Sequence, residues 1–262
     1  MPEGPSIVIL KEEAAAFTGC TIAAAGGNSK TVDYTRLVGQ PVLALHSWGK
    51  HFLIELPELV LRIHFLLFGS YRINARKDAQ PRLSLHFEGG GEFNFYACSV
   101  RQLELGMEGG LGAGIKALYD WRADVMSDQW LPALALKKLR AAPGMLACDA
   151  LLDQNIFSGV GNIIKNEVLF RLRIHPLSEV GALPAAKLRA LVKQAREYSF
   201  EFKAWKQAYE LKKHWLVHTK KMCPRCKIPL TKGYLGRTKR RSFYCERCQK
   251  VYKNLPQLLD CC

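Results

Sequence analysis

The chain has 262 residues, 48% of them hydrophobic, and this length leaves room for two domains and an appended module with well-buried cores. Its formal net charge of +15 and sequence pI near 9.5 favour nucleic acid or another anionic surface as the partner. The most apolar stretch, residues 52–68, contains Glu55, Glu58 and Arg62, which excludes a membrane span, and nothing in the sequence is similar to a signal peptide. A globular protein of the reducing cytoplasm, with no membrane partner, is therefore expected.

The first residues, Met1-Pro2-Glu3-Gly4-Pro5, carry an unusual chemical possibility. A small second residue permits removal of the initiator methionine, which would leave Pro2 with a free secondary amine. Such an amine condenses with an aldehyde-level carbon to an iminium that is cationic without further protonation, and Glu3 could move protons beside it. An ordinary chain start is the alternative on these residues alone.

The next segment predicts a short helix and then antiparallel strands. Pro5 begins a helical pattern that Gly19 is placed to end. Residues 42–45 and 52–54 predict a hairpin closed by Ser47-Trp48-Gly49-Lys50, and further strands are expected at 59–65, 82–87 and 93–96. An antiparallel β-sandwich domain over residues 1–115 is expected.

Residues 116–125 are expected to form a linker, after which the pattern becomes helical. Leucines at 131, 134, 136 and 139 predict one helix, and a second is expected to reach about Gln154. The turn Gly159-Val160-Gly161-Asn162 then precedes a helix over 163–170, and apolar residues from Leu188 to Trp205 predict one long amphipathic helix or two. A glycine turn at a helix N-terminus suits a phosphate, although a plain bend between packed helices remains the alternative. The helical domain is expected over 126–217.

The C-terminal segment contains two CxxC pairs, Cys223/Cys226 and Cys245/Cys248, separated by eighteen residues. This spacing predicts one structural Zn²⁺ held by four thiolates in a finger over 218–253. Residues 220–253 include twelve Lys or Arg and a single acid, Glu246, which favours a polyanion. Cys261 and Cys262 are expected to lie in an exposed tail, 254–262, and not to bind the metal.

Taken in chain order, these features closely resemble the formamidopyrimidine-DNA glycosylase and endonuclease VIII family, over residues 2–250. The resemblance rests on the N-terminal Pro-Glu-Gly-Pro, the Gly49-Lys50 turn, Leu152-Asp153-Gln154, Gly159-Val160-Gly161-Asn162, Glu167, and the finger ending Arg240-Arg241-Ser242-Phe243-Tyr244-Cys245. It implies an α+β multidomain fold: an N-terminal β-sandwich with a leading helix, a helix-two-turn-helix domain and a four-cysteine zinc finger.

The resemblance also implies an activity, that of a base-excision-repair DNA glycosylase with AP lyase activity. Pro2 would attack the anomeric carbon of a damaged nucleotide and form a Schiff base that collapses by β,δ-elimination. Glu3 would be the general acid/base, Lys50 would contact a nearby phosphate, and Glu167 would face the active site. For Glu167, an ordinary solvated helix acid is the alternative.

Contacts with DNA are implied for two further regions. Asn162 would bind the DNA backbone, assisted by N–H groups near Gly161, and Arg240 would clamp phosphate oxygens, with Arg241 as the rival assignment. The residues that fill the hole left by the displaced nucleotide would be Leu66, Leu67 and Phe68. The expected partner is double-stranded DNA with damaged bases or abasic sites, bound by a monomer.

Two departures from the family pattern bear on substrate range. The purine-repairing branch adds an Arg and a Phe from a second loop, whereas this chain has Tyr96-Ala97-Cys98-Ser99-Val100, which favours the endonuclease VIII branch and oxidised pyrimidines. Ser6 stands where the family has a second carboxylate, and it could instead cap the first helix. A binding protein of the same fold with weakened catalysis is the main alternative, and a zinc-ribbon RNA-associated factor is a third reading.

Overall fold

The computed structural model describes residues 2–105, 115 and 118–254, and the chain divides into two compact units, Met1–Trp121 and Arg122–Cys262. The regular elements of the first unit are α1 (Gly4–Glu13), β1 (Ile22–Gly26), β2 (Ala44–Trp48), β3 (His51–Glu55), β4 (Leu59–Ile73), β5 (Leu83–Phe87) and β6 (Glu92–Glu104). Short 3₁₀ turns lie at Ala15–Phe17, Tyr34–Arg36 and Trp121–Ala123.

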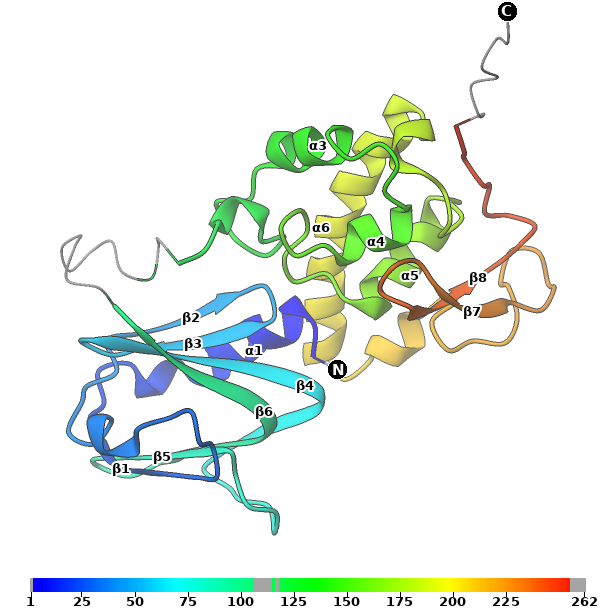
Figure 1. Cartoon of the computed structure of the whole chain (residues 1–262). Coiled ribbons are helices and arrows are strands. Elements are labelled where there is room, and N and C mark those ends of the chain that lie inside the picture. The colour runs from blue at the N-terminus through cyan, green and yellow to red at the C-terminus, as the bar shows by residue number, and fades with distance from the viewer. Residues whose placement is uncertain (1, 106–114, 116–117, 255–262) are drawn as a thin grey trace, which may run out of the picture. The chain divides into compact units, whose positions relative to one another are not determined.

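The strands form an antiparallel sheet in the order β1-β5-β6-β4-β3-β2. The long strands β4 and β6 pair along their whole length, apart from a shift in register between Phe65 and Ser70. On one side of this shift β3 and β2 extend the sheet, and on the other β5 and β1 do so, giving two layers (Figure 1). The expected β-sandwich is thus confirmed, and one pair of strands belongs to both of its layers.

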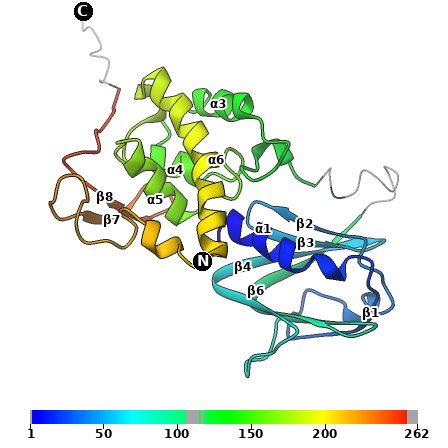
Figure 2. The ribbon, with the colours of Figure 1, turned by 180° about the vertical axis from the view of Figure 1, so that it is seen from behind.

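The core of the sandwich holds the apolar face of α1, which contacts β2 and β3 (Figure 2). Ile7 and Leu10 of this helix join Phe52, Phe93 and Phe95 in one buried cluster. Burial of such side chains contributes about 1.5–3 kcal/mol each. The packing of α1 into this core therefore fixes the position of Gly4, where the helix begins.

Two strand predictions were too short, and one strand was missed. β4 continues beyond the expected end at residue 65 to Ile73, and β6 runs over thirteen residues. β1 has the sequence Ile-Ala-Ala-Ala-Gly, which has weak β propensity, and it forms because β5 pairs with it.

The second unit contains a helical bundle and a small sheet. Its regular elements are α3 (Pro132–Arg140), α4 (Ala147–Leu152), α5 (Asn162–Arg171), α6 (Ala185–Gln207), β7 (Thr231–Leu235) and β8 (Arg240–Tyr244), with 3₁₀ turns at Val180–Ala182 and Leu211–His214. The helices share a core that includes Leu139, Phe157, Leu191 and Tyr198. The helix-two-turn-helix expectation is confirmed, with α4 and α5 flanking the glycine turn.

The finger has a core of its own next to α5. Phe170 at the end of α5 packs with Val217, Phe243, Cys223 and Cys245. Hydrophobic contact and the cysteine cluster therefore hold the finger against the helix in one unit. Across the described part of the chain, the longest helix, α6, is too polar to cross a lipid bilayer, and the shorter ones are too short.

Candidate nucleic-acid interface and metal centre

Pro2 and Glu3 directly precede α1, which begins at Gly4. Pro2 is partly exposed, whereas Glu3 is 1% exposed. Glu3 occupies the N-cap position, and its carbonyl accepts a hydrogen bond from the Ser6 N–H at 2.8 Å. The expectation that Ser6 caps the helix is wrong, because Ser6 already lies inside the first turn.

Lys50 lies in the two-residue turn between β2 and β3, where Trp48 pairs with His51. Gly49 has φ of 53°, a left-handed conformation that favours glycine. The hairpin therefore presents Lys50 as expected from the sequence. His51, the next residue, is largely buried, and this burial together with the charges of His64, Arg62 and Lys50 lowers its pKa to about 3.

The wedge segment, Leu66 to Phe68, lies in the register shift of β4. Leu66, Leu67 and Phe68 are 51%, 55% and 87% exposed. The partner strand passes this point with Ala97 alone, at φ of 48°, so the longer side of the bulge protrudes. A Cβ on Gly69 would lie 2.8 Å from the Phe65 Cβ, so only glycine fits there. The bulge thus exposes three large apolar side chains, on a backbone conformation that the glycine at position 69 permits.

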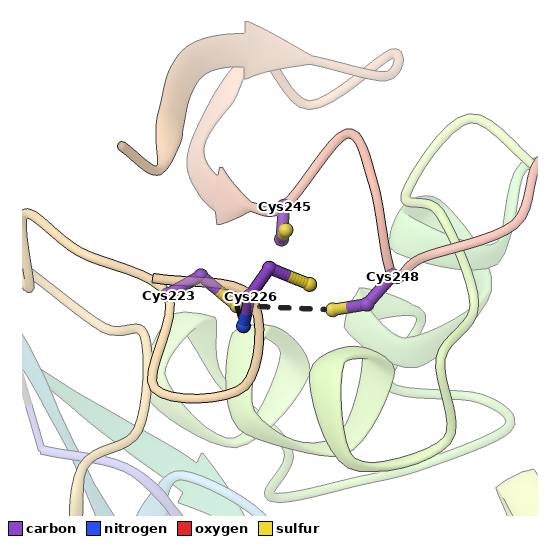
Figure 3. Close-up of side chains that lie close together, drawn as sticks. All are labelled: Cys223, Cys226, Cys245 and Cys248. Carbon is purple, nitrogen blue, oxygen red and sulfur yellow. Dashed lines mark hydrogen bonds between the residues drawn. The ribbon is translucent and has the colours of Figure 1, made fainter. Parts of the chain in front are cut away.

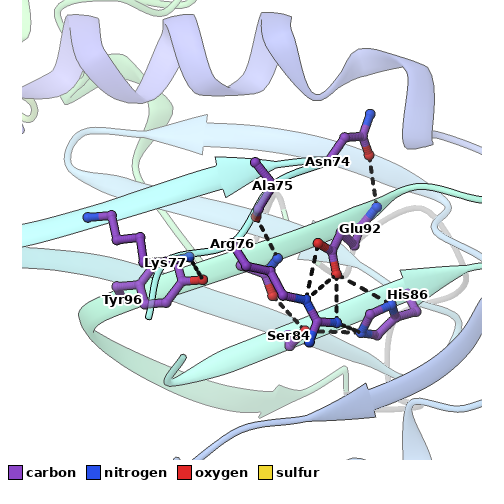
Figure 4. A network of polar contacts seen from close by, with 9 residues as sticks. Asn74, Ala75, Arg76, Lys77, Ser84, His86, Glu92 and Tyr96 are labelled. Atoms are coloured by element: carbon purple, nitrogen blue, oxygen red, sulfur yellow. Dashed lines mark hydrogen bonds and ion pairs between the residues drawn. The ribbon is translucent and has the colours of Figure 1, made fainter. Parts of the chain in front are cut away.

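A polar network fixes the chain beyond the wedge segment (Figure 4). Arg76 donates to both carboxylate oxygens of Glu92 and lies 2.8 Å from the Nε2 atom of His86. The Lys77 N–H donates to the Tyr96 hydroxyl at 3.1 Å. The Arg76 guanidinium lowers the pKa of Glu92. These contacts join the segment after β4 to β5 and β6, on the side of the bulge where Ser70 pairs with Tyr96.

The glycine turn before α5 is organised by Gln154. Its amide group donates to the carbonyls of Leu152 and Val160, and its Oε1 accepts from the Gly159 N–H at 3.1 Å. Gly159 has φ of 95° and requires glycine, whereas Gly161 is extended and is the N-cap of α5. Gln154 of the Leu-Asp-Gln motif therefore holds the glycine turn in shape, and both motifs belong to the family resemblance.

Side chains on α5 converge on one backbone carbonyl of β8. The Arg241 carbonyl accepts from Asn162 Nδ2 at 2.9 Å, Lys165 Nζ at 3.3 Å and Asn166 Nδ2 at 3.3 Å. Lys165 is fully buried and also donates to Ser242 Oγ at 2.8 Å. Asn162 and Arg241, both expected to contact DNA, are therefore brought together, and the helix sets the position of β8.

The two rival arginines differ in their surroundings. Arg241 donates to the Tyr234 hydroxyl at 3.0 Å and lies over its ring, 5.6 Å from the centroid. Arg240 is exposed, and among the described residues its side chain makes no hydrogen bond or ion pair. Arg240 is thus the guanidinium that can meet a ligand without breaking an existing bond.

Asp149 on α4 belongs to no motif that could have identified it from the sequence. Its carboxylate accepts hydrogen bonds from the N–H groups of Arg237 and Thr238, at 2.8 and 3.3 Å, in the turn between β7 and β8. A Cβ on Gly236 would lie 2.5 Å from Asp149 Oδ1, so this glycine permits the close approach. Asp149 therefore fixes the hairpin turn that carries Arg240.

Glu167 is fully buried on α5, so the solvated alternative is wrong. Its carboxylate accepts the N–H groups of Leu216, Val217 and His218 at 2.9, 3.0 and 2.7 Å. Burial raises the pKa of Glu167, and these three donors oppose the rise. The carboxylate anchors the segment leading into the finger, and its catalytic role stays a prediction.

The four cysteines expected to bind metal lie together (Figure 3). Their sulfur atoms all lie within 4.8 Å of one another, and those of Cys223 and Cys248 are 3.9 Å apart. Tetrahedral zinc thiolates with bonds of about 2.3 Å require sulfur separations of roughly 3.8 Å, which this cluster fits. The cluster can therefore bind a metal ion with four thiolates and no open position, as a structural site does. Cys261 and Cys262 lie outside the described residues.

The first cysteine knuckle also contacts α5. Arg225, between Cys223 and Cys226, donates to the carbonyls of Phe170 and Arg171 at 2.7 and 3.3 Å and lies over the Phe170 ring. These carbonyls end α5, where a cation is favourable. The knuckle thus caps the helix whose N-terminus carries Asn162.

Two family models match the sequence. The formamidopyrimidine-DNA glycosylase N-terminal domain matches residues 1–103, and the formamidopyrimidine-DNA glycosylase H2TH domain matches residues 128–199. The two matches follow one another in the order of the two units and together account for more than half of the chain.

Similar proteins bear names of the same family. Endonuclease 8-like 3 of Xenopus laevis is 30% identical over 243 residues, which cover 87% of this chain and 37% of that protein. Endonuclease 8-like 2 of Mus musculus is 34% identical over 217 residues, covering 75% of this chain and 61% of that protein. The chain thus spans about a third to three fifths of these relatives.

Solved structures share the fold. The formamidopyrimidine-DNA glycosylase of Lactococcus lactis, bound non-covalently to DNA containing an AP site, has a TM-score of 0.80 at 19% identity, covering 95% of this chain and 99% of that one. A viral DNA glycosylase has a TM-score of 0.79 at 19% identity, covering 95% and 100%. These structures show the fold, and the two family models show that the chain belongs to the formamidopyrimidine-DNA glycosylase and endonuclease VIII family.

Proposed function

We propose that the protein is a DNA-repair glycosylase with AP lyase activity that removes oxidised bases, chiefly pyrimidines. The observation that carries the proposal is Pro2 followed by Glu3 at the start of α1, in a chain of this family. A protein that only binds DNA has no need of an N-terminal secondary amine.

In the proposed reaction the Pro2 nitrogen, made a free amine by removal of Met1, attacks C1′ of the damaged nucleotide. The glycosidic bond breaks with its electron pair leaving on the base, which takes up the proton lost from the Pro2 nitrogen. Glu3 delivers a proton to the sugar ring oxygen, so the ring opens to an iminium between Pro2 and C1′. Loss of a proton from C2′ then expels the 3′ phosphate, and a second elimination expels the 5′ phosphate. The iminium acts as the electron sink in both eliminations.

The DNA strand would be held by cations and by helix α5. Lys50 serves as a point charge for a phosphate, and Asn162, with the N–H groups around Gly161, contacts the backbone. Arg240 serves as the phosphate clamp in preference to Arg241, since the Arg241 side chain already binds Tyr234. Leu66, Leu67 and Phe68 fill the hole left by the displaced nucleotide.

The lesion preference rests on β6. Residues Tyr96 to Val100 belong to this continuous strand, and their only irregularity is the single residue Ala97. A strand at this place offers no loop that could insert an arginine and a phenylalanine beside a purine. The similar proteins are named endonuclease 8-like 2 and 3, which supports the endonuclease VIII branch.

We further propose that the four cysteines bind one Zn²⁺, that the ion is structural, and that the protein acts as a monomer on double-stranded DNA. The ion would cross-link the two knuckles and so keep β8, with Arg240, in place. Its thiolates leave no position open for a substrate.

Borohydride trapping tests the activity. The wild type, incubated with DNA carrying an abasic site or an oxidised pyrimidine, is expected to give a covalent adduct because reduction fixes the iminium. Pro2→Gly, and a variant with an N-terminal extension that cannot be removed, should each lose at least about nine tenths of the adduct. Such a ten-fold loss in the rate of adduct formation requires the activation free energy to rise by only ~1.4 kcal/mol. Denaturing gels measure the adduct.

The outcomes separate the alternatives. If the wild type binds the DNA but forms no adduct on any lesion, the weakened binding protein becomes the better description. If the variant with the N-terminal extension keeps the adduct, an amine elsewhere in the chain is the nucleophile. Release of 8-oxoguanine faster than any oxidised pyrimidine would contradict the lesion preference and leave the glycosylase assignment intact.

A further inference from the structure

A polar pocket of about 340 Å³ opens on the surface of the first unit, where β3, β4 and β6 lie side by side. It is lined by His51, Arg62, His64, Leu66, Ser99 and Arg101. The strand register explains the grouping, since His64 pairs with both His51 and Ser99, and Arg62 pairs with Arg101. Five of its six lining residues are therefore polar groups fixed on one sheet face.

The charges in this pocket have one sign. Arg62 and Arg101 lie directly opposite each other on neighbouring antiparallel strands, an arrangement that is destabilising for like charges. Among the described residues, neither guanidinium has an acidic group within the 4.0 Å that defines an ion pair. An anion between them would turn this repulsion into attraction.

The two histidines add hydrogen-bonding groups without adding charge. Burial and the neighbouring Arg62 and Lys50 lower the pKa of both His51 and His64. The Nδ1 atom of His51 is buried and has no hydrogen-bond partner among the described residues. Neutral imidazoles at neutral pH often bind metal ions, but two guanidinium groups in the same pocket oppose a cation.

The donor set fits a tetrahedral oxyanion. Two guanidinium groups can bind two oxygens of a phosphate in pairs, and the Ser99 hydroxyl can donate to another. Leu66 is shared by the pocket wall and the wedge segment, so the pocket lies beside the side chains proposed to enter the DNA stack.

We propose that this pocket binds one phosphodiester group of the DNA strand beside the wedge segment, with Arg62 and Arg101 as its principal donors. The inference rests on the proposed function, since it takes DNA as the ligand. It extends the DNA contacts from the turn of Lys50 onto the outer face of β4 and β6. Phosphate contacts of this kind position the duplex and carry no sequence information.

The test measures the affinity for a duplex with an abasic-site analogue by fluorescence anisotropy across salt concentrations. Arg62→Ala and Arg101→Ala should each weaken binding about ten-fold, and the double variant should lower the slope of log affinity against log salt by about 1. Arg72→Ala, which removes the same charge from an exposed position farther along β4, should change affinity less than two-fold. Equal losses in all three variants would overturn the proposal.

A second measurement identifies the phosphate. Replacing single phosphates near the lesion with uncharged methylphosphonates should reproduce the loss at one position, and there the Arg62→Ala loss should largely vanish, as expected for two groups in contact. If the loss of affinity from each phosphate replacement simply adds to the loss from Arg62→Ala, the pocket holds no DNA phosphate. Ser99→Ala, a milder change, serves if an arginine variant does not fold, and should give a smaller loss at the same position.

Borohydride trapping separates this proposal from the activity. If the arginine variants bind and trap abasic DNA like the wild type, the pocket proposal fails and the glycosylase proposal stands. If the wild type traps no lesion, the proposed function fails and takes the DNA ligand of this pocket with it.

Discussion

At the scale of single residues, burial decides what several titratable groups can do. It lowers the pKa of His218 to about 4 and raises that of Cys98 to about 12, so neither titrates near neutral pH. Cys98 in the sandwich core is accordingly a packing residue and not a nucleophile. In the histidines beside Lys50, as in His218, burial and neighbouring cations lower the pKa in the same direction.

His51 predicts a pH dependence of stability. Its pKa is lowered from 6.5 to about 3 on folding. Below about pH 6.5 His51 is therefore protonated in the unfolded chain, whereas in the folded unit it stays neutral until the pH approaches 3. Stability is therefore highest above pH 6.5 and falls as the pH decreases, by up to about 1.4 kcal/mol per pH unit from this group. Urea unfolding at about pH 7 and about pH 5 should show a smaller difference for His51→Gln than for the wild type.

A matched control is His214→Gln, which changes a half-exposed histidine of the other unit. It should leave the pH dependence of the first unit as in the wild type. An identical pH dependence in the wild type and in His51→Gln would show that His51 accepts its proton in the folded state.

At the scale of elements, the hairpin β7–β8 is positioned from two directions by helices. Three side chains of α5 bind the Arg241 carbonyl, and Asp149 of α4 binds the turn at Arg237 and Thr238. A two-stranded hairpin is only marginally stable alone, so these contacts and the cysteine cluster determine where Arg240 lies. The glycines at 236 and 69 act similarly, since each allows a close approach that a side chain would block.

Asp149→Ala should weaken DNA binding about five-fold, since the loss of hydrogen bonds worth ~1 kcal/mol releases the turn that carries Arg240. The direction is informative because removing an acid makes the protein more cationic, which by itself strengthens binding. Asp128→Ala removes the same charge from an exposed position and should bind DNA equally well or slightly better. Fluorescence anisotropy measures both, and Asp149→Ala binding as tightly as Asp128→Ala would contradict the positioning role.

At the scale of the whole molecule, the finger and the helical bundle form one compact unit, whereas the sandwich forms another. Arg225 caps α5, and the Gln249 amide donates to the Ile174 carbonyl at 2.8 Å, just beyond that helix. The cysteine cluster is therefore tied into the helical domain by direct hydrogen bonds, so loss of the proposed metal should affect structure beyond the finger.

Removal of the metal by chelation, or Cys226→Ser, should expose the amides of β7, β8 and the last turn of α5 to hydrogen exchange, because metal binding energy is folding energy for such a module. The strands of the sandwich should keep their protection, and DNA binding should fall at least about ten-fold with the loss of several phosphate contacts. Hydrogen-exchange mass spectrometry follows each element. Cys20→Ser, which changes a partly exposed cysteine of the first unit, should leave all of them protected. Unchanged protection of β8 without metal would refute the dependence.

Local patterns were sufficient for much of this molecule. The CxxC spacing identified Cys223, Cys226, Cys245 and Cys248, the Gly49-Lys50 pair marked the hairpin, and the three-and-four periodicity located α6. Each of these signals depends on residues close in sequence or on a fixed ligand geometry. The same signals missed β1 and the extension of β4, because an alanine-rich strand and a bulged strand form only where a partner strand pairs with them.

The sequence by itself therefore determined the four-cysteine cluster, the N-terminal Pro2–Glu3 pair and, through the family resemblance, the fold class, since spacing and motifs are written along the chain. Only the tertiary structure decided that Glu167 is buried against three amides, that Asp149 holds the finger hairpin, and that Arg62 and Arg101 share a pocket. The physical reason is separation in sequence: Asp149 and Arg237 lie 88 residues apart, and only the packing of helices and strands brings such groups within hydrogen-bond distance.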